Sequence, residues 1–182
     1  TDTWIALPTA GATTARWSHA AAWTGTEMIV WGGWDNSNPL NTGGKYNPTT
    51  NTWVGVTATA GAPSTRLAHS AVWDGFEMIV FGGQTGSGGS ALNTGGRYNP
   101  VTDSWTATTT TNAAAARWSH DAVWTGQEMI VWGGAPAFLN SGKHYRPPIA
   151  LTAGTYTGTF TITDPAAANS PKNVGVTFTV GP

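Results

Sequence analysis

The sequence repeats itself with a period near 50 residues. Three copies of one motif begin at Arg16, Arg66 and Arg117, which lie 50 and 51 residues apart. The copies read RWSHAAAWTGTEMIVWGG, RLAHSAVWDGFEMIVFGG and RWSHDAVWTGQEMIVWGG, and a second motif follows the first two of them, LNTGGKYNPTTNTW and LNTGGRYNPVTDSW. A fixed period of this length indicates a repeat architecture in which each copy is one supersecondary unit.

Each period contains the patterns of four short strands joined by turns. The second copy shows them in order: a strand over residues 66–73, a two-residue type I′ hairpin at Asp74-Gly75, an apolar strand over 77–81 that ends at Gly82-Gly83, and strands over 94–98 and 104–108. The glycine pair is expected where backbone freedom or close approach is needed. The sequence therefore predicts an all-β fold of four-stranded units.

This pattern resembles the kelch repeat, which forms one blade of a β-propeller, and in particular the bacterial, secreted type. The landmarks are the glycine pairs at 32–33, 82–83 and 133–134, the tyrosines Tyr46, Tyr98 and Tyr145, and Trp53 and Trp105, each seven residues after its tyrosine. The resemblance covers residues 1–148. It implies that the histidine-containing strand is innermost, beside a central channel, and that the tryptophan strand is outermost.

The strand count is unbalanced at both ends of this region. Residues 1–8 match an outer strand, with Trp4 as its tryptophan, whereas the third copy lacks an outer strand after Tyr145. Propellers typically have four to eight blades, so three blades cannot close a ring. We expect a kelch-type propeller arc of three four-stranded blades, completed to a six-bladed ring by a homodimer that places Trp4 of one chain beside Tyr145, His144 and Arg146 of the other. The alternatives are a piece of a longer propeller, another ring size and an open polymer.

Residues 149–182 break the repeat. Thr155–Thr163 and Val174–Val180 alternate Thr or Gly with apolar or aromatic residues, which predicts two half-buried strands. Asp164-Pro165 and Asn169-Ser170-Pro171 are expected to bound the loop between them. This β-hairpin resembles the last strands of a bacterial immunoglobulin-like domain.

Composition excludes several classes of function. Charged residues make up 9% of the chain and the net charge is −1, so no basic surface favours nucleic acid. The absence of cysteine excludes a disulfide framework, cysteine-ligated metal and a cysteine nucleophile. No run of 18 apolar residues predicts a membrane span, and no signal peptide begins the chain. Low charge and abundant Thr, Gly and Trp favour a mature extracellular or periplasmic bacterial protein.

Some polar residues recur in every copy. They are the histidines His19, His69 and His120, the glutamates Glu27, Glu77 and Glu128, and the arginines Arg16, Arg66 and Arg117. We expect the histidines to be satisfied within the blades rather than to bind metal, and the glutamates to pair with the repeated arginines. The sharpest ligand hypothesis for a repeated set is anion binding by the three arginines near the channel mouth. No metal site, cofactor or catalytic residue is predicted.

Residues that break the repeat are the better candidates for specific binding. The loops after the glycine pairs carry Trp34 with Asp35 and, in the third copy, Phe138, a combination that suits sugar stacking with hydroxyl hydrogen bonds. Asp121, His144 and Arg146 also break the pattern. We expect His144 and Arg146 to serve an interface.

The function that we expect is a non-catalytic extracellular binding or scaffold module. It would associate with itself and bind carbohydrate or protein through its loop face or channel. One alternative is a kelch-type isomerase or lyase that acts on an acidic sugar with channel Arg, His and Glu. Another is a fragment of a larger propeller with no independent function. The chain lacks the G-x-S-x-G nucleophile elbow and any glycine-rich loop that leads into a helix.

Overall fold

The regular elements of the described chain are all β strands. A computed structural model describes residues 2–148, 154–162 and 172–180. The chain divides into two units, Thr1–Pro147 and Pro148–Pro182. The all-β expectation is therefore confirmed over the part that the structure describes. That part contains no helix long and apolar enough to cross a membrane.

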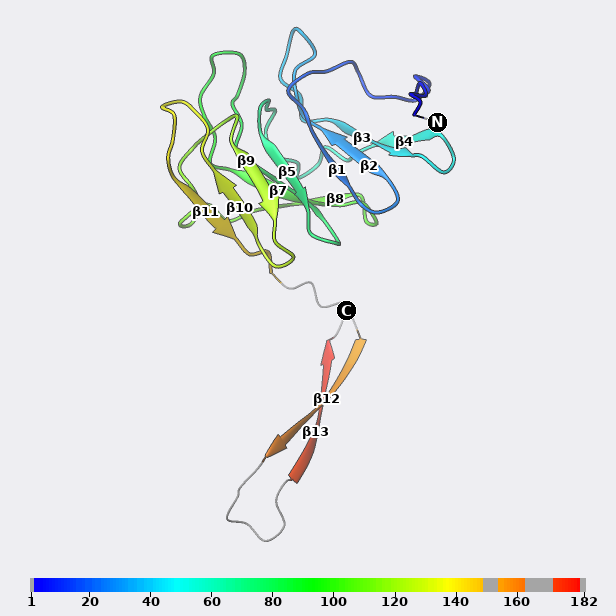
Figure 1. Cartoon of the computed structure of the whole chain (residues 1–182), viewed down its shortest axis with the longest axis vertical. Coiled ribbons are helices and arrows are strands. Elements are labelled where there is room, and N and C mark those ends of the chain that lie inside the picture. The colour runs from blue at the N-terminus through cyan, green and yellow to red at the C-terminus, as the bar shows by residue number, and fades with distance from the viewer. Residues whose placement is uncertain (1, 149–153, 163–171, 181–182) are drawn as a thin grey trace. The chain divides into compact units, whose positions relative to one another are not determined.

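The first unit contains three antiparallel sheets, which we call blades 1, 2 and 3, in chain order (Figure 1). Blade 1 comprises β1 (Ala20–Trp23), β2 (Met28–Trp31), β3 (Gly43–Asn47) and β4 (Thr52–Val56). Blade 2 comprises β5 (Ser70–Trp73), β6 (Met78–Phe81), β7 (Gly95–Asn99) and β8 (Ser104–Ala107). Blade 3 comprises β9 (Asp121–Trp124), β10 (Met129–Trp132) and β11 (Gly142–Tyr145). Within each blade, neighbours in sequence are neighbours in the sheet, so the predicted propeller arc is confirmed.

The register relates equivalent positions in the three blades. Ala20, Ser70 and Asp121 begin the first strands and pair with Trp31, Phe81 and Trp132, respectively. The tyrosines Tyr46, Tyr98 and Tyr145 pair with Met28, Met78 and Met129. These correspondences allow a contact seen in one blade to be sought in the next.

Apolar side chains fill the space between consecutive blades. Ile29 and Trp31 of blade 1 cluster with Met78, Val80 and Tyr98 of blade 2. Val72 and Ile79 of blade 2 form the corresponding cluster with Met129 and Val131 of blade 3. The first strands of consecutive blades, β1 with β5 and β5 with β9, lie next to each other. This arrangement agrees with an innermost position for the histidine strand.

The first strand of each blade is shorter than the sequence predicted. We expected a strand over residues 66–73, but β5 begins only at Ser70. The reason is Ala68, which has a φ of 53° in the left-handed region and interrupts the extended backbone. Ser18 and Ser119 have φ values of 50° at the equivalent positions.

The hairpin after this strand lies at the predicted place, but its turn type was wrong. Trp73 pairs with Met78 and the Asp74 N–H donates to the Glu77 carbonyl at 3.1 Å, so the turn is centred on Gly75-Phe76 rather than on Asp74-Gly75. A type I′ turn needs positive φ at both central residues, and within this loop only Gly75 has it. Instead, Asp74 Oδ1 accepts hydrogen bonds from the backbone N–H groups of Phe76 and Glu77, both at 2.7 Å. An Asx turn therefore shapes the loop.

The glycine pairs lie where blades approach most closely. A Cβ atom on Gly82 would lie 2.7 Å from both the carbonyl oxygen of Arg117 and Cε1 of His120 in the next blade. A Cβ atom on Gly83 would lie 2.8 Å from the carbonyl oxygen of Leu67. Both glycines have positive φ. The expectation of close approach at this pair is confirmed.

Blade 3 differs from the others because it has three strands. No described strand pairs with the outer side of β11, as the sequence count predicted. Residues 2–8 contain no strand, and the Trp4 side chain is fully exposed, at 101% of its reference area. The N-terminal segment therefore completes no blade within its own chain.

The second unit contains the predicted hairpin. β12 (Gly154–Ile162) pairs antiparallel with β13 (Lys172–Val180) over nine residue pairs. The turn signals Asp164-Pro165 and Asn169-Ser170-Pro171 lie outside the described residues.

Candidate functional site

The repeated arginines bind backbone carbonyl groups within their own blades. Arg66 donates to the carbonyl oxygens of Ser64, Gly82 and Thr94 at 2.8–3.0 Å. Arg16 and Arg117 make the corresponding bonds, to Thr14, Gly32 and Thr42 and to Ala115, Gly133 and Ser141. Burial lowers the pKa of Arg66 to about 10 and lowers those of Arg16 and Arg117. These cations stabilise the point where the second strand ends and the third begins.

This geometry bears on the anion-binding hypothesis. Arg66 and Arg117 are each 1% exposed, and their guanidinium donors point at carbonyl oxygens. Arg16 is half-buried, with the same set of acceptors. Anion binding at Arg16, Arg66 and Arg117 stays a prediction, and an incoming anion would have to compete with these internal acceptors.

The repeated glutamates do not pair with the repeated arginines, so that expectation was wrong. Glu77 instead pairs with Arg97 of β7, at 2.7 Å. Glu128 accepts a hydrogen bond from Arg146 Nε at 2.9 Å and lies 2.7 Å from His144 Nδ1. These contacts lower the pKa of Glu128. The physical reason is that carbonyl oxygens already occupy the donors of the repeated arginines, whereas the glutamates lie beside the third strand.

The repeated histidines pack beneath the glycine pair of the preceding blade. A Cβ atom on Gly32 would lie 2.5 Å from Cε1 of His69. The His69 ring packs edge-on against Trp31, and the His120 ring packs in the same way against Phe81. Burial lowers the pKa of His69 to about 3 and that of His120 to about 4. The two rings are therefore neutral at neutral pH and serve the contact between blades. The expectation that each histidine is satisfied within its own blade was wrong, because His120 Nε2 lies 2.8 Å from Ser70 Oγ of the preceding blade and neither ring nitrogen of His69 has a partner among the described residues. No described group of His, Asp and Glu is arranged to hold a metal.

His19 is the exception among the histidines because the described residues contain no blade before blade 1. Its side chain is exposed, whereas His69 and His120 are buried. Partial burial and the Arg16 charge lower its pKa. His19 therefore presents, at the start of the arc, the group that His69 and His120 use to join blades.

The two ends of the arc expose residues whose equivalents inside it are buried or half-buried. On blade 3, Val123, Ile130 and Trp132 are 57%, 38% and 59% exposed, and we call this set the trailing face. Their equivalents in blades 1 and 2 are Ala22, Ile29, Trp31, Val72, Ile79 and Phe81, which pack against the next blade. On blade 1, Trp23 is exposed, whereas Trp73 and Trp124 are partly buried. We call His19, Trp23 and Met28 the leading face.

Backbone groups at the two ends match in the same way. Within the arc, Gly33 N–H donates to the carbonyl of Arg66, and Gly83 N–H donates to the carbonyl of Arg117, both at 2.8 Å. The equivalent donor on blade 3 is Gly134, and the equivalent acceptor on blade 1 is Arg16. Neither has a backbone partner among the described residues. One end of the arc therefore has the free donor, and the other the free acceptor, of a backbone hydrogen bond that joins consecutive blades twice within the arc.

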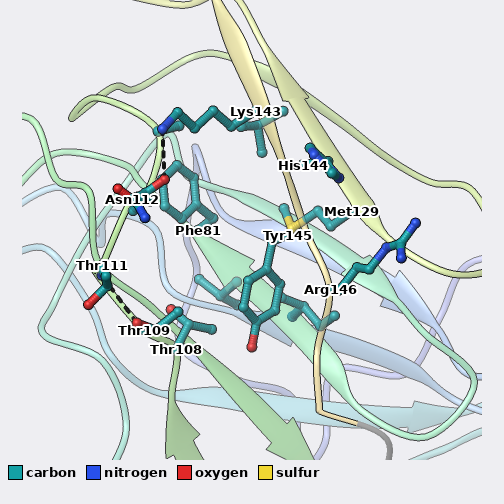
Figure 2. Close-up of a pocket in the computed structure, with 15 residues that line it drawn as sticks. Phe81, Thr108, Thr109, Thr111, Asn112, Met129, Lys143, His144, Tyr145 and Arg146 are labelled. Carbon is teal, nitrogen blue, oxygen red and sulfur yellow. Dashed lines mark hydrogen bonds between the residues drawn. The ribbon is translucent and has the colours of Figure 1, made fainter.

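A cavity of about 270 Å³ lies beside the outer edge of blade 3. Phe81, Met129 and Tyr145 line its apolar part, and residues 108, 109 and 111–114 of the preceding segment line another side. Lys143 Nζ donates to the carbonyl oxygen of Asn112 at 2.9 Å (Figure 2). The predicted interface residues Tyr145, His144 and Arg146 all line this cavity, whereas Trp4 of the same chain is not among its lining residues. Burial raises the pKa of Tyr145.

The loop candidates fall into two kinds. Trp34 is half-buried and lies over the loop of blade 2, because a Cβ atom on Gly86 would be 3.7 Å from its ring. Asp35 Oδ1 accepts hydrogen bonds from the N–H groups of Ser37 and Asn38, which lower its pKa. Phe138 is 98% exposed. Of the three predicted residues, Phe138 alone presents a whole aromatic ring to solvent, and ligand binding at all three stays a prediction.

Sequence reasoning missed two features of the contact between blades. Ser70 and its bond to His120 were not singled out, although the repeat places three different residues at this position. The unequal surroundings of the glycine pairs were also missed: a Cβ atom on Gly133 would meet only Leu139 O, at 3.7 Å. Comparing the repeats position by position would have indicated the first feature, whereas the second requires coordinates.

Comparison with known proteins agrees with this architecture. A family model described as the KLHDC2/KLHL20/DRC7 Kelch-repeats domain matches residues 1–150, which include all three blades. No curated protein sequence matches the chain.

Proposed function

The chain belongs to the kelch-repeat family, and on this premise we propose that it is a non-catalytic binding and scaffold module that associates with itself. Kelch-repeat domains generally mediate protein binding. The observation that carries the proposal of self-association is the exposure of the trailing face, whose equivalents are buried twice inside the arc. A second copy would offer its leading face as the next blade.

The apolar surfaces of the two faces are complementary. In the arc, Ile29 and Trp31 pack against Met78, and Ile79 packs against Met129. The same sequence pattern would place Ile130 and Trp132 against Met28 of a second copy. Two such contacts between two arcs give a ring of six blades with a two-fold axis, a closed assembly that leaves neither end open.

Polar groups at the same junction support this pairing. Ser70 Oγ lies 2.8 Å from His120 Nε2 in the next blade. Asp121 occupies the equivalent position in blade 3, where it pairs with Trp132 of the trailing face, and His19 occupies that of His120 on the leading face. The closing junction would therefore join a carboxylate to an imidazole, which is a stronger hydrogen bond than that of a hydroxyl.

Sedimentation velocity over a concentration series tests this self-association. We expect the wild-type chain to sediment as two chains and the Ile130→Asp variant as one, because the new carboxylate would be buried in the junction. Val101→Asp is the matched control, since Val101 is 91% exposed in the turn before β8. If the Ile130→Asp variant retains the wild-type sedimentation coefficient, the trailing face is not the interface.

A second candidate function is ligand binding at the loop face. Phe138 is fully exposed and Asp35 is a half-buried carboxylate, a pair of chemical groups that suits a sugar ring and its hydroxyls. Protein is the other ligand class that this surface could accept. Calorimetric titration with oligosaccharides tests the carbohydrate proposal, and Phe138→Ala should remove any heat of binding. Binding that survives this substitution would exclude Phe138 from the site.

The enzymatic alternative has less support. An isomerase or lyase acting on an acidic sugar would use channel Arg, His and Glu, but the arginines bind carbonyl groups and two histidines are buried. Incubation of the chain with uronic acids and detection of products by mass spectrometry tests this alternative. Turnover that Arg66→Ala abolishes in a folded variant would favour it over the scaffold.

We also propose an extracellular or periplasmic location and an immunoglobulin-like origin for residues 149–182. The first rests on composition and the second on the two alternating strands. Fractionation of the source cells tests the location, since recovery in the cytosol alone would contradict it. The proposed immunoglobulin-like origin would be supported if residues 149–182 form part of a folded immunoglobulin-like domain in a longer form of the chain.

A further inference from the structure

Blade 2 holds the tryptophan of its outer strand in a defined socket. The Trp105 ring packs against Tyr98 and Trp31, with ring centroids 5.1 and 4.9 Å away. Its Nε1 donates to the carbonyl oxygen of Ala58 at 3.0 Å. The Tyr98 hydroxyl bonds Asp103 Oδ1 at 2.6 Å, which ties the start of the outer strand to the third strand.

Blade 1 repeats this arrangement. The ring centroid of Trp53 lies 5.4 Å from that of Tyr46, and Trp53 Nε1 donates to the carbonyl oxygen of Pro8 at 3.0 Å. The Tyr46 hydroxyl bonds Asn51 Oδ1 at 2.6 Å. The socket therefore consists of a tyrosine and a carbonyl acceptor from the preceding segment. The strand that fills it has the sequence Thr-Asp/Asn-Ser/Thr-Trp.

Blade 3 has the socket without the strand. Tyr145 is its tyrosine, Phe81 occupies the position of Trp31, and Thr109 occupies the position of Ala58. All three line the cavity of about 270 Å³ (Figure 2). No described strand pairs with β11 on this side.

The N-terminal segment has the sequence that the socket requires. Residues 1–4 read Thr-Asp-Thr-Trp, and residues 102–105 read Thr-Asp-Ser-Trp. Trp4 precedes Arg16 by twelve residues, as Trp105 precedes Arg117. Trp4 is fully exposed and Ile5 is nearly so. We propose that the cavity beside β11 is a binding site for a tryptophan-bearing strand, and that residues 2–8 of a second copy occupy it.

The chain's own Trp4 cannot reach this site. Pro8 is held at blade 1 by Trp53, and four residues of extended chain span at most about 14 Å. The socket of blade 3 lies two blades further on, at roughly 20 Å for sheets that pack about 10 Å apart. A second copy has no such limit, because its residues 2–8 lead directly into the blade that would follow blade 3.

Blade 3 differs from blade 2 at two positions of this socket, and the second difference offsets part of the first. The third strand has Gly96 facing Trp105 in blade 2 but Lys143 in blade 3. A Cβ atom on Gly96 would lie 2.7 Å from Pro63 Cγ and 3.1 Å from Trp105 Cε3. The residue at the position of Pro63 is Ala114 in blade 3, which has no Cγ. Lys143 directs its amino group to Asn112, so only its Cβ would stand against the Trp4 ring, which would have to lie a few tenths of an ångström further out than Trp105 does.

The filled sockets define the expected contacts. Trp4 would pack on Tyr145 and Phe81, and its Nε1 would donate to the carbonyl oxygen of Thr109. Asp2 would accept the hydrogen bond from the Tyr145 hydroxyl, as Asp103 does from Tyr98. The register of β7 with β8 pairs Arg97 with Thr106, so His144 would face Ile5 of the second copy.

Disulfide trapping tests this register, because the chain has no cysteine of its own. A chain carrying Ile5→Cys is mixed with a chain carrying His144→Cys, and the disulfide between them is followed on non-reducing gels. Arg146→Cys is the matched control, since both side chains contact Glu128 and are similarly exposed, at 68% and 64%. We expect the His144→Cys chain to form the disulfide at least about tenfold faster, because disulfide bonds require Cβ atoms about 4 Å apart.

A second substitution identifies the part played by the tryptophan. Trp4→Ala in the Ile5→Cys chain should lower the rate by about tenfold or more, since a buried aromatic anchor carries much of the binding energy of a strand. Equal rates with the two partner chains, or a rate that Trp4→Ala leaves unchanged, would overturn the proposal. A disulfide within one chain that carries both Ile5→Cys and His144→Cys would overturn the second copy as occupant.

This inference rests on the proposed self-association, and the two can fail separately. Light scattering on the same unmodified chain reports association independently of the strand. A mass of two chains without register-specific trapping would leave the contact between faces standing and would overturn strand exchange. A mass of one chain without trapping would overturn both.

Discussion

Ser70 Oγ lies 2.8 Å from His120 Nε2, and this hydrogen bond joins blade 2 to blade 3. The equivalent residue in blade 1 is Ala20, so His69 has no hydroxyl partner there, and neither of its ring nitrogens has a protein partner. The equivalent residue in blade 3 is Asp121. One position of the repeat therefore carries three different side chains, and the charged one lies at the open end.

The first prediction concerns this hydrogen bond. Ser70→Ala should lower the free energy of unfolding by about 1 kcal/mol, because it leaves His120 without its partner. Ala20→Ser should raise it by a similar amount by giving His69 the partner that it lacks. Urea denaturation of both variants checks the pair. Equal stabilities of wild type and Ala20→Ser would show that position 20 does not face His69 as Ser70 faces His120.

The second prediction concerns the stability of the folded chain at acid pH. The pKa values of His69 and His120 in the folded chain are about 3 and about 4, below the ordinary value of 6.5. Between pH 6.5 and 4 the unfolded chain binds protons at these positions and the folded chain does not. The free energy of unfolding should therefore fall as pH falls through this window, by about 1.4 kcal/mol per pH unit for each histidine. Above pH 6.5 the two histidines are neutral in both states, so this loss of stability is absent there.

Urea denaturation at several pH values between 7 and 4 measures this dependence. The control is His69→Gln, which should show a smaller loss of stability between pH 6.5 and 4 than the wild type does. A pH dependence that is the same in both chains would mean that His69 does not stay neutral in the folded state.

The third prediction concerns the repeated arginines. Arg66→Ala should lower the free energy of unfolding by about 3 kcal/mol or more, since it leaves the carbonyl oxygen of Gly82 without a donor and removes one of the two hydrogen bonds of Thr94 O, which also accepts from Gly82 N–H. Arg16→Ala should cost less, because Arg16 is half-buried whereas Arg66 is buried. Thermal denaturation of the two variants checks the order of their stabilities. If both variants were as stable as the wild type, the arginines would be free for a ligand.

The fourth prediction uses two glycines with positive φ and open surroundings. Gly133 and Gly126 have φ values of +73° and +98°, and an added Cβ on either would meet nothing closer than 3.7 Å within one chain. The equivalent of Gly133 in blade 2 is Gly82, where a Cβ would clash with the next blade. Gly133→Ala should therefore reduce self-association, whereas Gly126→Ala should not. Sedimentation velocity of both variants measures their self-association. If Gly133→Ala associates as strongly as Gly126→Ala, the interface lies elsewhere.

The fifth prediction concerns the charged residue at the open end. Asp121→Ala should weaken self-association by about tenfold, because it removes the partner proposed for His19. Asp121→Ser should retain most of the affinity, since it reproduces the bond of Ser70 to His120. The dissociation constants follow from dilution series. Equal constants for wild type and Asp121→Ala would remove Asp121 from the junction.

The repeat predicted the blades more reliably than it predicted their polar contacts. The spacing of the glycine pairs, tyrosines and tryptophans was enough to order the strands and to find the outer strand that blade 3 lacks. The pairing of Glu77 was wrong because charge alone suggested Arg66, whereas Arg97 lies beside it and Arg66 binds carbonyl groups. Backbone acceptors carry no signal in the sequence, so such a role could not be predicted.

The local backbone was the other limit. Asp74-Gly75 is a strong signal for a type I′ hairpin, but the carboxylate of Asp74 accepts hydrogen bonds from two N–H groups and the turn is centred on Gly75-Phe76 instead. Ala68 gave no sign of its left-handed conformation. In this conformation the Ala68 N–H donates across the blades to the carbonyl of Ser18, a contact between residues 50 positions apart.

The mass of the chain in solution, measured by size-exclusion chromatography with multi-angle light scattering, tests the central claim most directly. Two arcs joined trailing face to leading face, with exchanged N-terminal strands, predict twice the mass of one chain at micromolar concentration. A mass of one chain that does not change with concentration would contradict this assembly, and with it the proposed pairing of Trp4 with the Tyr145 socket.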